Sequence, residues 1–470
     1  MAGALCSTLD PVQVHRVCHV KRFLERWAAD EIFRHQLEVD PADATRRYRL
    51  EVDPEDIRPL WNHPKNASFN AAALQHASDL VADYCAVRQS KRDISERFRQ
   101  ECEPTNVKLK TWRQRQIARG RSEFTPELFA AIHHPPFAIE LSDGCSVGCW
   151  FCGVSAKKFG INWEYTHANA QLWKDILAVL AKMTGLRAAS RGFLYWATDP
   201  LDNPDYELFA EDFREMFGSF PHTTTAQAHR NLQRTRNLLR FATPEDPFLL
   251  RLSVLSTRIL DILHESFSAE ELAFVEIIPQ TAGSLIEKVR VGKARASEIE
   301  QSPKKIQLAQ SDDGRTIACV SGFILNLVKK EVRLVSPCSA SDRWPSGYYV
   351  YDVGHFDDAA DLECVLKRMI DNCMHQFPAS DRLVKFRPDL KFASTDNGFR
   401  VGNKYSEQLF EGGRWVSAFG EAIQEGVYTA ETIGEWVTAN LGLPSTITEN
   451  WLLDLFQAGV LDEQPQHPFS

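Results

Sequence analysis

Three cysteines near the middle of the chain have the types and spacing of a ligand set. Cys145, Cys149 and Cys152 form a Cys-x3-Cys-x2-Cys triplet that follows a short β-branched and aromatic run at 137–142, the pattern of a strand end. Iron–sulfur clusters are usually held by four thiolates, so three closely spaced cysteines leave one iron open to another molecule. The triplet therefore predicts an iron–sulfur site at which chemistry can take place.

The residues around the triplet fit a wrapped cluster. Gly144 and Gly148 let the loop close without Cβ clashes, and Phe151 offers a flat apolar face beside the open iron. The alternative is a structural zinc knuckle, which needs a fourth ligand nearby. The nearest upstream candidates, His133 and His134, lie on the far side of the predicted strand.

Composition sets the broad class. The 470 residues are enough for two or three domains. The hydrophobic content of 44% and the charged content of 25% are those of an ordinary globular protein. A net charge of −9 argues against nucleic acid as a partner. We find no apolar run of transmembrane length and no signal peptide, so we expect no membrane partner.

The remaining cysteines also carry information. Eight of the eleven cysteines are scattered singly along the chain, without a second Cys-x2-Cys pair. This pattern argues against a disulfide framework and for a reducing cytoplasm, which an open cluster also requires. It also argues against auxiliary clusters, so we expect one cluster.

The hydrophobic period divides the chain into three regions. We expect a helical N-terminal region at 1–130, an α/β region at 131–378 and a small, mostly helical C-terminal region at 379–470. In the α/β region strands and helices alternate, which predicts right-handed βαβ units and a parallel sheet with its site at the carboxyl ends of the strands. We expect strands at 137–142, 192–197, 223–228, 249–255 and 273–278, a hairpin at 315–336 and a strand at 347–353.

The segment Cys149-Trp150-Phe151-Cys152 completes a Cys-x3-Cys-x-aromatic-Cys fingerprint, which resembles that of the radical S-adenosylmethionine (SAM) superfamily. The resemblance implies a partial (β/α)6 barrel, one [4Fe–4S] cluster, SAM, and an electron donor such as flavodoxin or ferredoxin. With that fold, the cysteine loop lies at the carboxyl end of the first strand.

Residues at the other strand ends are candidates for binding SAM. In the resembled superfamily the second strand ends in a Gly-Gly-Glu-like motif, whose place is taken here by Thr198 and Asp199. Asp199 could accept a hydrogen bond from the ammonium group, although the glycines are absent. Arg251 and Ser253 lie two apart on one strand face and could reach ribose or carboxylate, and the alternative for Ser253 is simple packing. Ile277 would form part of an apolar wall for adenine.

Over most of 12–400 the chain resembles radical SAM peptide epimerases that mature ribosomally made peptides of the proteusin kind. The resemblance rests on FAIELSDGCSVGCWFCGVSAKKFG (137–160), LYWATDPLDNPDY (194–206) and VRLVSPCSASDRWPSGYYVYD (332–352). It implies conversion of L to D residues in a precursor peptide, with one cysteine donating hydrogen. Cys338 matches that donor, because it follows a strand and a proline where a thiol can face a cavity, and Cys373 is the alternative.

Both ends of the chain offer a binding interpretation and a structural one. The segment 22–50 resembles nitrile-hydratase-like leader peptides, or it is an amphipathic helical pair. The basic stretch 108–121 meets an acidic precursor peptide, or it is a solvated helix. The ending at 429–462 is similar to winged-helix modules, some of which bind leader peptides.

Three other functions stay open. The first is radical SAM C-methylation or crosslinking of a peptide. The second is radical chemistry on a small metabolite. The third is a non-catalytic zinc- or leader-binding protein.

Overall fold

The computed structural model describes residues 9–62, 78–286, 288–299 and 316–465. Residues 1–8 and 63–77 of the predicted helical region lie outside these ranges, as does residue 315, where the predicted hairpin begins. No helix within the described ranges combines the length and the apolar character needed to cross a bilayer.

The N-terminal region is helical, as predicted. Most of its helices begin at a side chain that accepts a backbone N–H, because the first turn of a helix has no internal acceptor for those groups. Asp40, for example, ends one helix and accepts a hydrogen bond of 2.9 Å from the backbone N–H of Asp43 in the next. The helices are α1 (Pro11–Ala29), α2 (Glu31–Val39), α3 (Pro41–Arg47), α4 (Arg58–Trp61), α5 (Asp79–Glu101), α6 (Val107–Gly120) and α7 (Pro126–Ala131).

The middle region is a mixed α/β structure with parallel strands. Its parallel strands are β1 (Phe137–Glu140), β4 (Thr223–Thr225), β5 (Leu250–Val254) and β6 (Glu276–Pro279). Strands β4, β5 and β6 pair in that order. Two parallel bridges, Ala138 to Phe193 and Phe193 to His222, connect β1 to β4.

The predicted strand at 192–197 is wrong beyond this bridge. The chain leaves the strand direction after Phe193, and the backbone N–H of Ala197 donates to the Glu140 carboxylate at 2.8 Å instead of to a neighbouring strand. A side-chain acceptor has replaced the sheet ladder, which propensity alone does not reveal.

The other side of β1 carries the predicted hairpin. Strand β7 (Gly322–Asn326) pairs parallel with β1, and β8 (Glu331–Pro337) and β9 (Tyr348–His355) follow antiparallel. The turn passes through Lys330 with a φ of 51°. Because β8 runs opposite to β1, its last residues lie at the same end of the sheet as the first residues of β1.

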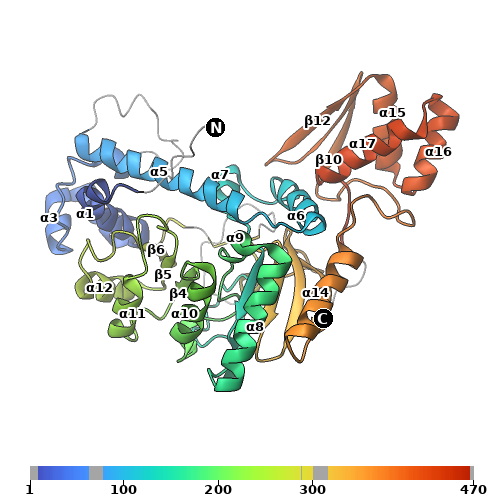
Figure 1. Ribbon diagram of the computed structural model, residues 1–470. Coiled ribbons are helices and arrows are strands. Elements are labelled where there is room, and N and C mark those ends of the chain that lie inside the picture. The colour runs from blue at the N-terminus through green and yellow to red at the C-terminus, as the bar shows by residue number, and fades with distance from the viewer. Residues whose placement is uncertain (1–8, 63–77, 287, 300–315, 466–470) are drawn as a thin grey trace, which may run out of the picture.

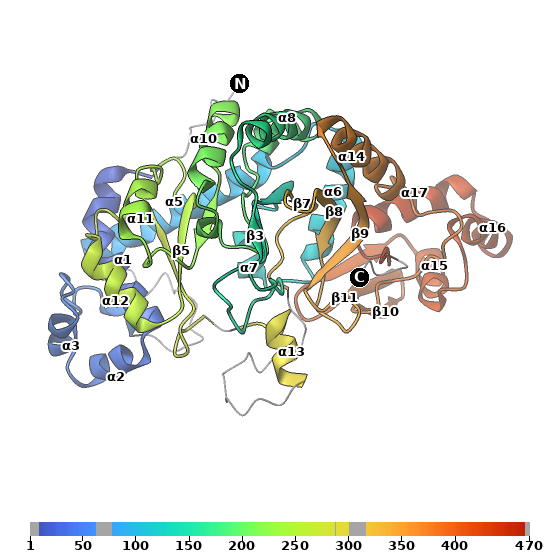
Figure 2. The same ribbon diagram turned by 90° about the horizontal axis from the view of Figure 1, so that it is seen from below.

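Helices cover one side of these strands. Figure 2 shows α12, α11, α10, α8 and α14 following one another along the outer side of the strands. Buried aromatic and aliphatic side chains of these helices and strands, such as Trp173, Phe209 and Leu252, form one hydrophobic cluster. These helices are α8 (His167–Thr184), α10 (Tyr206–Phe217), α11 (Leu232–Leu239), α12 (Thr257–Ser266) and α14 (Ala359–Cys373).

The expectation of a mostly helical C-terminal region is wrong in part. Three antiparallel strands, β10 (Lys391–Thr395), β11 (Gly398–Gly402) and β12 (Glu407–Glu411), precede the helices, and Figure 1 shows them beside α15, α16 and α17. Phe399 and Val401 on β11 are buried against these helices, so an apolar face too short to stand out in the sequence forms the sheet. The helices are α15 (Arg414–Glu425), α16 (Ala430–Leu441) and α17 (Ser445–Gln457).

Candidate functional site

The three cysteines lie on a loop at the carboxyl end of β1. The loop is closed at its base by the short antiparallel pair β2 (Ser142–Asp143) and β3 (Ile161–Asn162). Gly144 has a φ of 84°, and a Cβ there would collide with the Lys158 carbonyl oxygen. A glycine is therefore required where the chain turns into the loop.

The thiols of the triplet are free and partly accessible. Cys145, Cys149 and Cys152 are each partly exposed and unpaired. Burial raises the pKa of Cys145 to about 12 and that of Cys149 to about 11, so both are thiols at neutral pH, and binding a metal would release their protons. The backbone N–H of Ala156 points at Cys152 Sγ at 3.3 Å, a contact that stabilises a thiolate.

The donor set fits an iron–sulfur cluster better than a zinc knuckle. His133 and His134 precede β1 and so lie at its opposite end, and His133 Nε2 is 2.8 Å from the Ser95 hydroxyl. Neither histidine is placed to complete a zinc site with the triplet. Within the described ranges, moreover, the triplet is not among the ligand sets whose atoms all lie within 4.8 Å, so the three sulfurs are spread more widely than a single zinc ion requires.

A segment that the sequence reasoning missed packs against the cysteine loop. The Lys288 ammonium lies 5.0 Å from the centre of the Phe151 ring, and desolvation lowers the pKa of Lys288 to about 8. The backbone N–H of Lys293 donates to the Cys152 carbonyl at 2.9 Å. Single lysines in a loop give no sequence signal, so only the fold identifies them.

Asp199 lies near the cysteine loop, but its carboxylate already has partners. It accepts from the Thr225 hydroxyl at 2.7 Å and from the backbone N–H of Ala226 at 2.8 Å and of Leu201 at 3.0 Å. Burial raises the pKa of Asp199 to about 6. Thr198 is buried beside it. These contacts join the second and third strand ends, and one lone pair of Asp199 is left for a ligand.

Asp202, three residues further on, was missed by the sequence reasoning. Its carboxylate accepts from the backbone N–H of Ser146 at 2.8 Å and from the Gln227 side-chain amide at 2.7 Å. Since Ser146 directly follows Cys145, Asp202 fixes the position of the first cysteine. Its place in the quoted segment 194–206 was the signal that could have found it.

The predicted SAM contacts on β5 and β6 have different surroundings. Arg251 is held inside the sheet, where its guanidinium donates to the Tyr195 hydroxyl at 2.9 Å. Ser253 lies two residues further on, opposite Ile278 in the register. Ile277 lines a cavity of about 540 Å³ between β6, α1 and α5. The described residues around that cavity include none from the cysteine loop, so Ile277 is not placed as an adenine wall there, because the N-terminal helices cover the edge strand β6.

Cys338 is buried rather than exposed to an open cavity. The residue is 1% exposed, and its backbone N–H donates to the Gly347 carbonyl at 3.0 Å. Burial raises the pKa of the Cys338 thiol well above its usual range. Because Cys338 follows β8, which runs opposite to β1, it lies near the amino-terminal end of β1. The triplet loop begins at the carboxyl end of β1.

The segment that follows Cys338 nevertheless reaches the triplet loop. Val154 of the loop packs against the apolar cluster that contains Cys338. The backbone N–H of Gly292 donates to the Pro345 carbonyl at 2.7 Å, and that of Lys293 donates to the Cys152 carbonyl.

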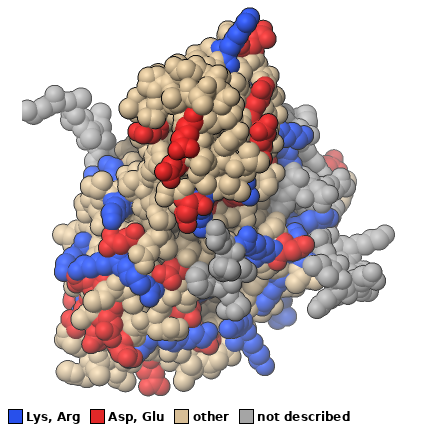
Figure 3. Space-filling view, turned by 90° about the vertical axis from the view of Figure 1, so that its right-hand side faces the viewer, with Lys and Arg blue, Asp and Glu red and all other residues tan. Residues whose placement is uncertain are grey.

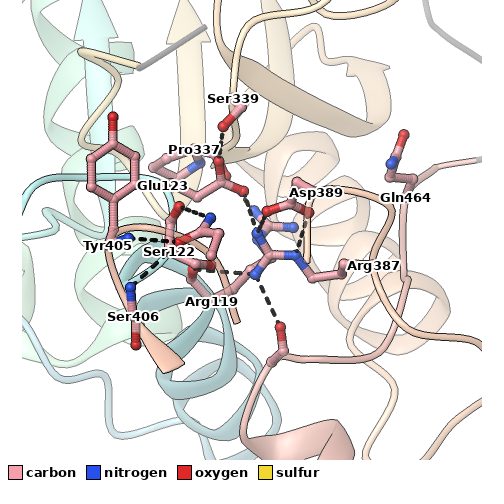
Figure 4. Close-up of polar contacts among 12 residues, drawn as sticks. Arg119, Ser122, Glu123, Pro337, Ser339, Arg387, Asp389, Tyr405, Ser406 and Gln464 are labelled. Carbon is pink, nitrogen blue, oxygen red and sulfur yellow. Dashed lines mark hydrogen bonds and ion pairs between the residues drawn. The ribbon is translucent and has the colours of Figure 1, made fainter. Parts of the chain in front are cut away.

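A network of buried charges surrounds the Cys338 segment (Figure 4). Arg387 pairs with Glu123 at 2.7 Å and with Asp389 at 2.6 Å. Glu123 also accepts from the Ser339 hydroxyl, and Arg119 donates to the Pro337 carbonyl. These contacts hold α6, the end of β8 and the C-terminal region together.

The basic stretch 108–121 is neither a solvated helix nor an exposed binding face along its arginines. Arg113, Arg115 and Arg119 are each at most 2% exposed and donate to carbonyl or carboxylate oxygens of the interior. Cys373 lies on α14 and lines a separate cavity of about 290 Å³ next to the C-terminal region.

A cavity of about 400 Å³ adjoins the cysteine loop. Gly144 and Ser155 of the loop line it, as do Trp344 and Tyr348 from the other side. Glu140, the last residue of β1, is 3% exposed in its wall. This partly open, polar and aromatic space beside the cysteine loop is the candidate substrate site.

Glu140 anchors the wall of that cavity. It accepts from the Asn326 amide at 2.9 Å and pairs with Arg333 at 3.6 Å. The sequence reasoning missed Glu140, although a glutamate inside the buried run FAIE was the available signal.

Comparison with known proteins gives one extensive match. No family model matches the chain. Among solved structures, the crystal structure of BtrN in complex with AdoMet and 2-DOIA is 18% identical, with coverage of 31% of this chain and 56% of that one, at a TM-score of 0.24, which is too low to carry an argument. The uncharacterized protein y4wI of Sinorhizobium fredii is 36% identical over 459 residues, or 96% of this chain and 88% of that protein. The chain therefore belongs to the same family as y4wI.

Proposed function

We propose that this protein is a radical SAM enzyme. The observation that carries the proposal is the Cys-x3-Cys-x2-Cys loop at the carboxyl end of a parallel strand, beside a cavity of about 400 Å³. In this proposal the parallel strands form the partial (β/α)6 barrel that the sequence implies. Cys145, Cys149 and Cys152 would hold one [4Fe–4S] cluster.

When bound, the reduced cluster and SAM supply a 5′-deoxyadenosyl radical that removes a hydrogen atom from an unactivated C–H bond. The chain itself positions and shields. Asp202 fixes the loop through Ser146. Asp199, next to Thr198, is bound to the end of β4, and Ser253 lies near the carboxyl end of β5. Residues 288–293 cover one side of the loop, which limits access of water to the site.

The finer proposal is epimerisation of L to D residues in a ribosomally made precursor peptide. It rests on the sequence resemblance, and two features of the chain are compatible with it. Strand β12 is an edge strand of its sheet, which can pair with an extended peptide. Acidic side chains are also exposed on the C-terminal region, as the red residues in the upper part of Figure 3 show. Glu407, Glu411 and Glu431 are exposed, and this charge would favour a basic peptide segment.

Cys338 is the proposed hydrogen donor, and Cys373 is the alternative. A donor thiol must keep its proton at neutral pH, and burial raises the pKa of both thiols. Cys338 belongs to the same apolar cluster as Trp344 and Tyr348, which line the cavity beside the cysteine loop. The proposal therefore requires the 338–347 segment to open toward that cavity.

Anaerobic reconstitution tests the radical SAM proposal. We expect the reconstituted protein to bind four irons, to absorb near 400 nm and to release 5′-deoxyadenosine from SAM with dithionite or reduced flavodoxin. A colourless protein that binds zinc at the triplet and leaves SAM intact would contradict the proposal.

Incubation with a precursor peptide in heavy water tests the epimerisation. A thiol proton exchanges with solvent, so each D residue should carry one deuterium at Cα, found by hydrolysis and chiral analysis. Cys338→Ala should still cleave SAM but form no D residue, and Cys373→Ala is the matched control. A mass increase of one methyl group, or a loss of two hydrogens, would indicate methylation or crosslinking instead. Turnover of a small metabolite without any peptide would indicate radical chemistry on a metabolite.

We further propose that the enzyme works in the cytoplasm with a flavodoxin or ferredoxin as electron donor. Cluster reduction by the purified donor, followed by electron paramagnetic resonance, tests this pairing.

A further inference from the structure

Two adjacent side chains of α1 meet an acidic side chain from far along the chain. Cys18 and His19 lie on α1, and Glu270 lies between α12 and β6. Glu270 Oε1 is 3.1 Å from His19 Nε2 and 3.7 Å from Cys18 Sγ. The three ligand atoms all lie within 4.8 Å of one another. Across the described ranges, no other group of three Cys, His, Asp or Glu side chains meets that criterion.

The three atoms form a donor set that suits zinc. A sulfur, an imidazole nitrogen and a carboxylate oxygen are the ligand types that Zn²⁺ takes in proteins. Zinc bonds of about 2.0–2.3 Å place neighbouring ligand atoms about 3–4 Å apart in a tetrahedral site, and the distances of 3.1 Å and 3.7 Å from Glu270 Oε1 to His19 Nε2 and Cys18 Sγ fall in that range. A zinc ion could therefore bind after small side-chain adjustments.

A fourth ligand is within reach. Glu51 Oε2 lies 4.0 Å from His19 Nε2, so two carboxylates approach a single imidazole. One protonated imidazole can balance only one of them, whereas a divalent cation balances both together. We propose that Cys18, His19 and Glu270, with Glu51 or water as the fourth ligand, form a binding site for Zn²⁺ or a similar divalent cation.

The site is accessible and independent of the cysteine loop. Cys18 is 2% exposed, but the side chains of His19 and Glu270 are 27% and 49% exposed, so an ion can enter from solvent. It would replace the hydrogen bond of 3.0 Å that the Cys18 thiol donates to the His15 carbonyl, and the thiol proton would pass to solvent.

The position indicates a structural role. The site lies where α1 packs on the segment that leads into β6, and the Arg22 guanidinium donates to the Phe267 carbonyl nearby. An ion bound there would connect the N-terminal helices to the parallel sheet across a long loop of chain. A cation that binds only the folded protein stabilises it in proportion to the logarithm of its concentration over Kd.

Zinc titration of the full chain tests the proposal. The triplet must not compete, so the background protein carries Cys145→Ala, Cys149→Ala and Cys152→Ala. Under reducing, metal-free conditions, with a chelating dye as competitor, we expect this background to bind one Zn²⁺. His19→Gln, Glu270→Gln and Cys18→Ser should each weaken binding at least tenfold, whereas Cys85→Ser on α5 should not.

Cobalt and thermal unfolding provide independent readouts. Co²⁺ in the background protein should give a thiolate charge-transfer band in the near ultraviolet, and Cys18→Ser should remove it. Zn²⁺ should raise the Tm of the background but not that of Glu270→Gln. If Cys18→Ser fails to fold, the partly exposed His19 and Glu270 variants decide. Absence of zinc binding to the background, or equal affinity in His19→Gln and Glu270→Gln, would overturn the site.

Discussion

The cysteines at the two ends of the strands in the sheet β1-β7-β8-β9 have opposite environments. At the carboxyl edge of β1, the triplet sits on a loop with partly exposed, free thiols. Near the amino-terminal end of β1, Cys338 is buried beside the Arg387–Glu123 pair, and both charged side chains of the pair are at most 3% exposed. A loop with unused donor atoms can bind a ligand, whereas a segment held by buried ion pairs supports the fold. The difference predicts which substitutions affect chemistry and which affect stability.

The largest effect on chemistry is expected in the triplet loop, at the carboxyl end of β1. Cys145→Ala should reduce cluster iron to background and abolish release of 5′-deoxyadenosine, because a cluster cannot be retained by two of its three cysteines. Its Tm should change by only a few degrees, because the thiol is partly exposed. Iron analysis, SAM cleavage and calorimetry check this, and retention of a SAM-cleaving cluster would contradict our assignment.

The largest effect on stability is expected at the buried Arg387–Glu123 pair beside Cys338. Arg387→Met leaves Glu123 and Asp389 without their cation, and breaking a buried pair costs about 3–5 kcal/mol. Denaturant unfolding measures this loss, and iron binding per folded molecule should stay unchanged. Arg400→Met is the control in the same region, because the Arg400–Glu407 pair is exposed and should contribute at most about 1 kcal/mol. Equal losses in the free energy of unfolding for the two variants would show that the buried pair is no more important for stability than the exposed one.

An intermediate effect is expected at Asp202, which contacts the loop without being a ligand. Asp202→Ala removes the acceptors for the Ser146 backbone and the Gln227 amide, so the first cysteine is less well positioned. We expect a severalfold lower iron occupancy with a small change in stability. Asp205→Ala, three residues away, is the comparison, and an unchanged occupancy in Asp202→Ala would show that the loop positions itself.

The smallest effect is a pH dependence at Lys288. The folded-state pKa of about 8 lies below the unfolded value of about 10.4, so the folded protein binds fewer protons than the unfolded one between these values. Stability of the cluster-free protein should therefore rise with pH from about 8 to 10, and Lys288→Met should flatten that rise. Urea unfolding at several pH values checks this, and an identical slope in the variant would contradict it.

Several features could be predicted because they depend on local sequence. The helical N-terminal region follows from the 3.6-residue period and from capping residues such as Asp40. The hairpin follows from alternating side chains around Lys329 and Lys330. The triplet is recognisable because its ligands are close together in the chain.

Other features depended on partners that are distant in the sequence. The strand predicted at 192–197 was shortened because Glu140, more than fifty residues earlier, accepts the Ala197 N–H. Arg113, Arg115 and Arg119 give a basic pattern that predicts an exposed face, but interior oxygens from other segments bury them. The β-strands of the C-terminal region were missed because their apolar faces are short and depend on α15 to α17.

By itself, the sequence determined that three thiols are held within eight residues after a strand, since ligand spacing and strand pattern are both local properties. Only the tertiary structure decided which residues share that loop's surroundings. The direction of β8 puts Cys338 beside the start of β1, and tertiary packing places Val154 of the loop against the same apolar cluster. Helices α1 and α5 cover β6, where Ile277 lines a separate cavity. Side-chain proximity across a sheet depends on strand direction and packing, which no single stretch of sequence encodes.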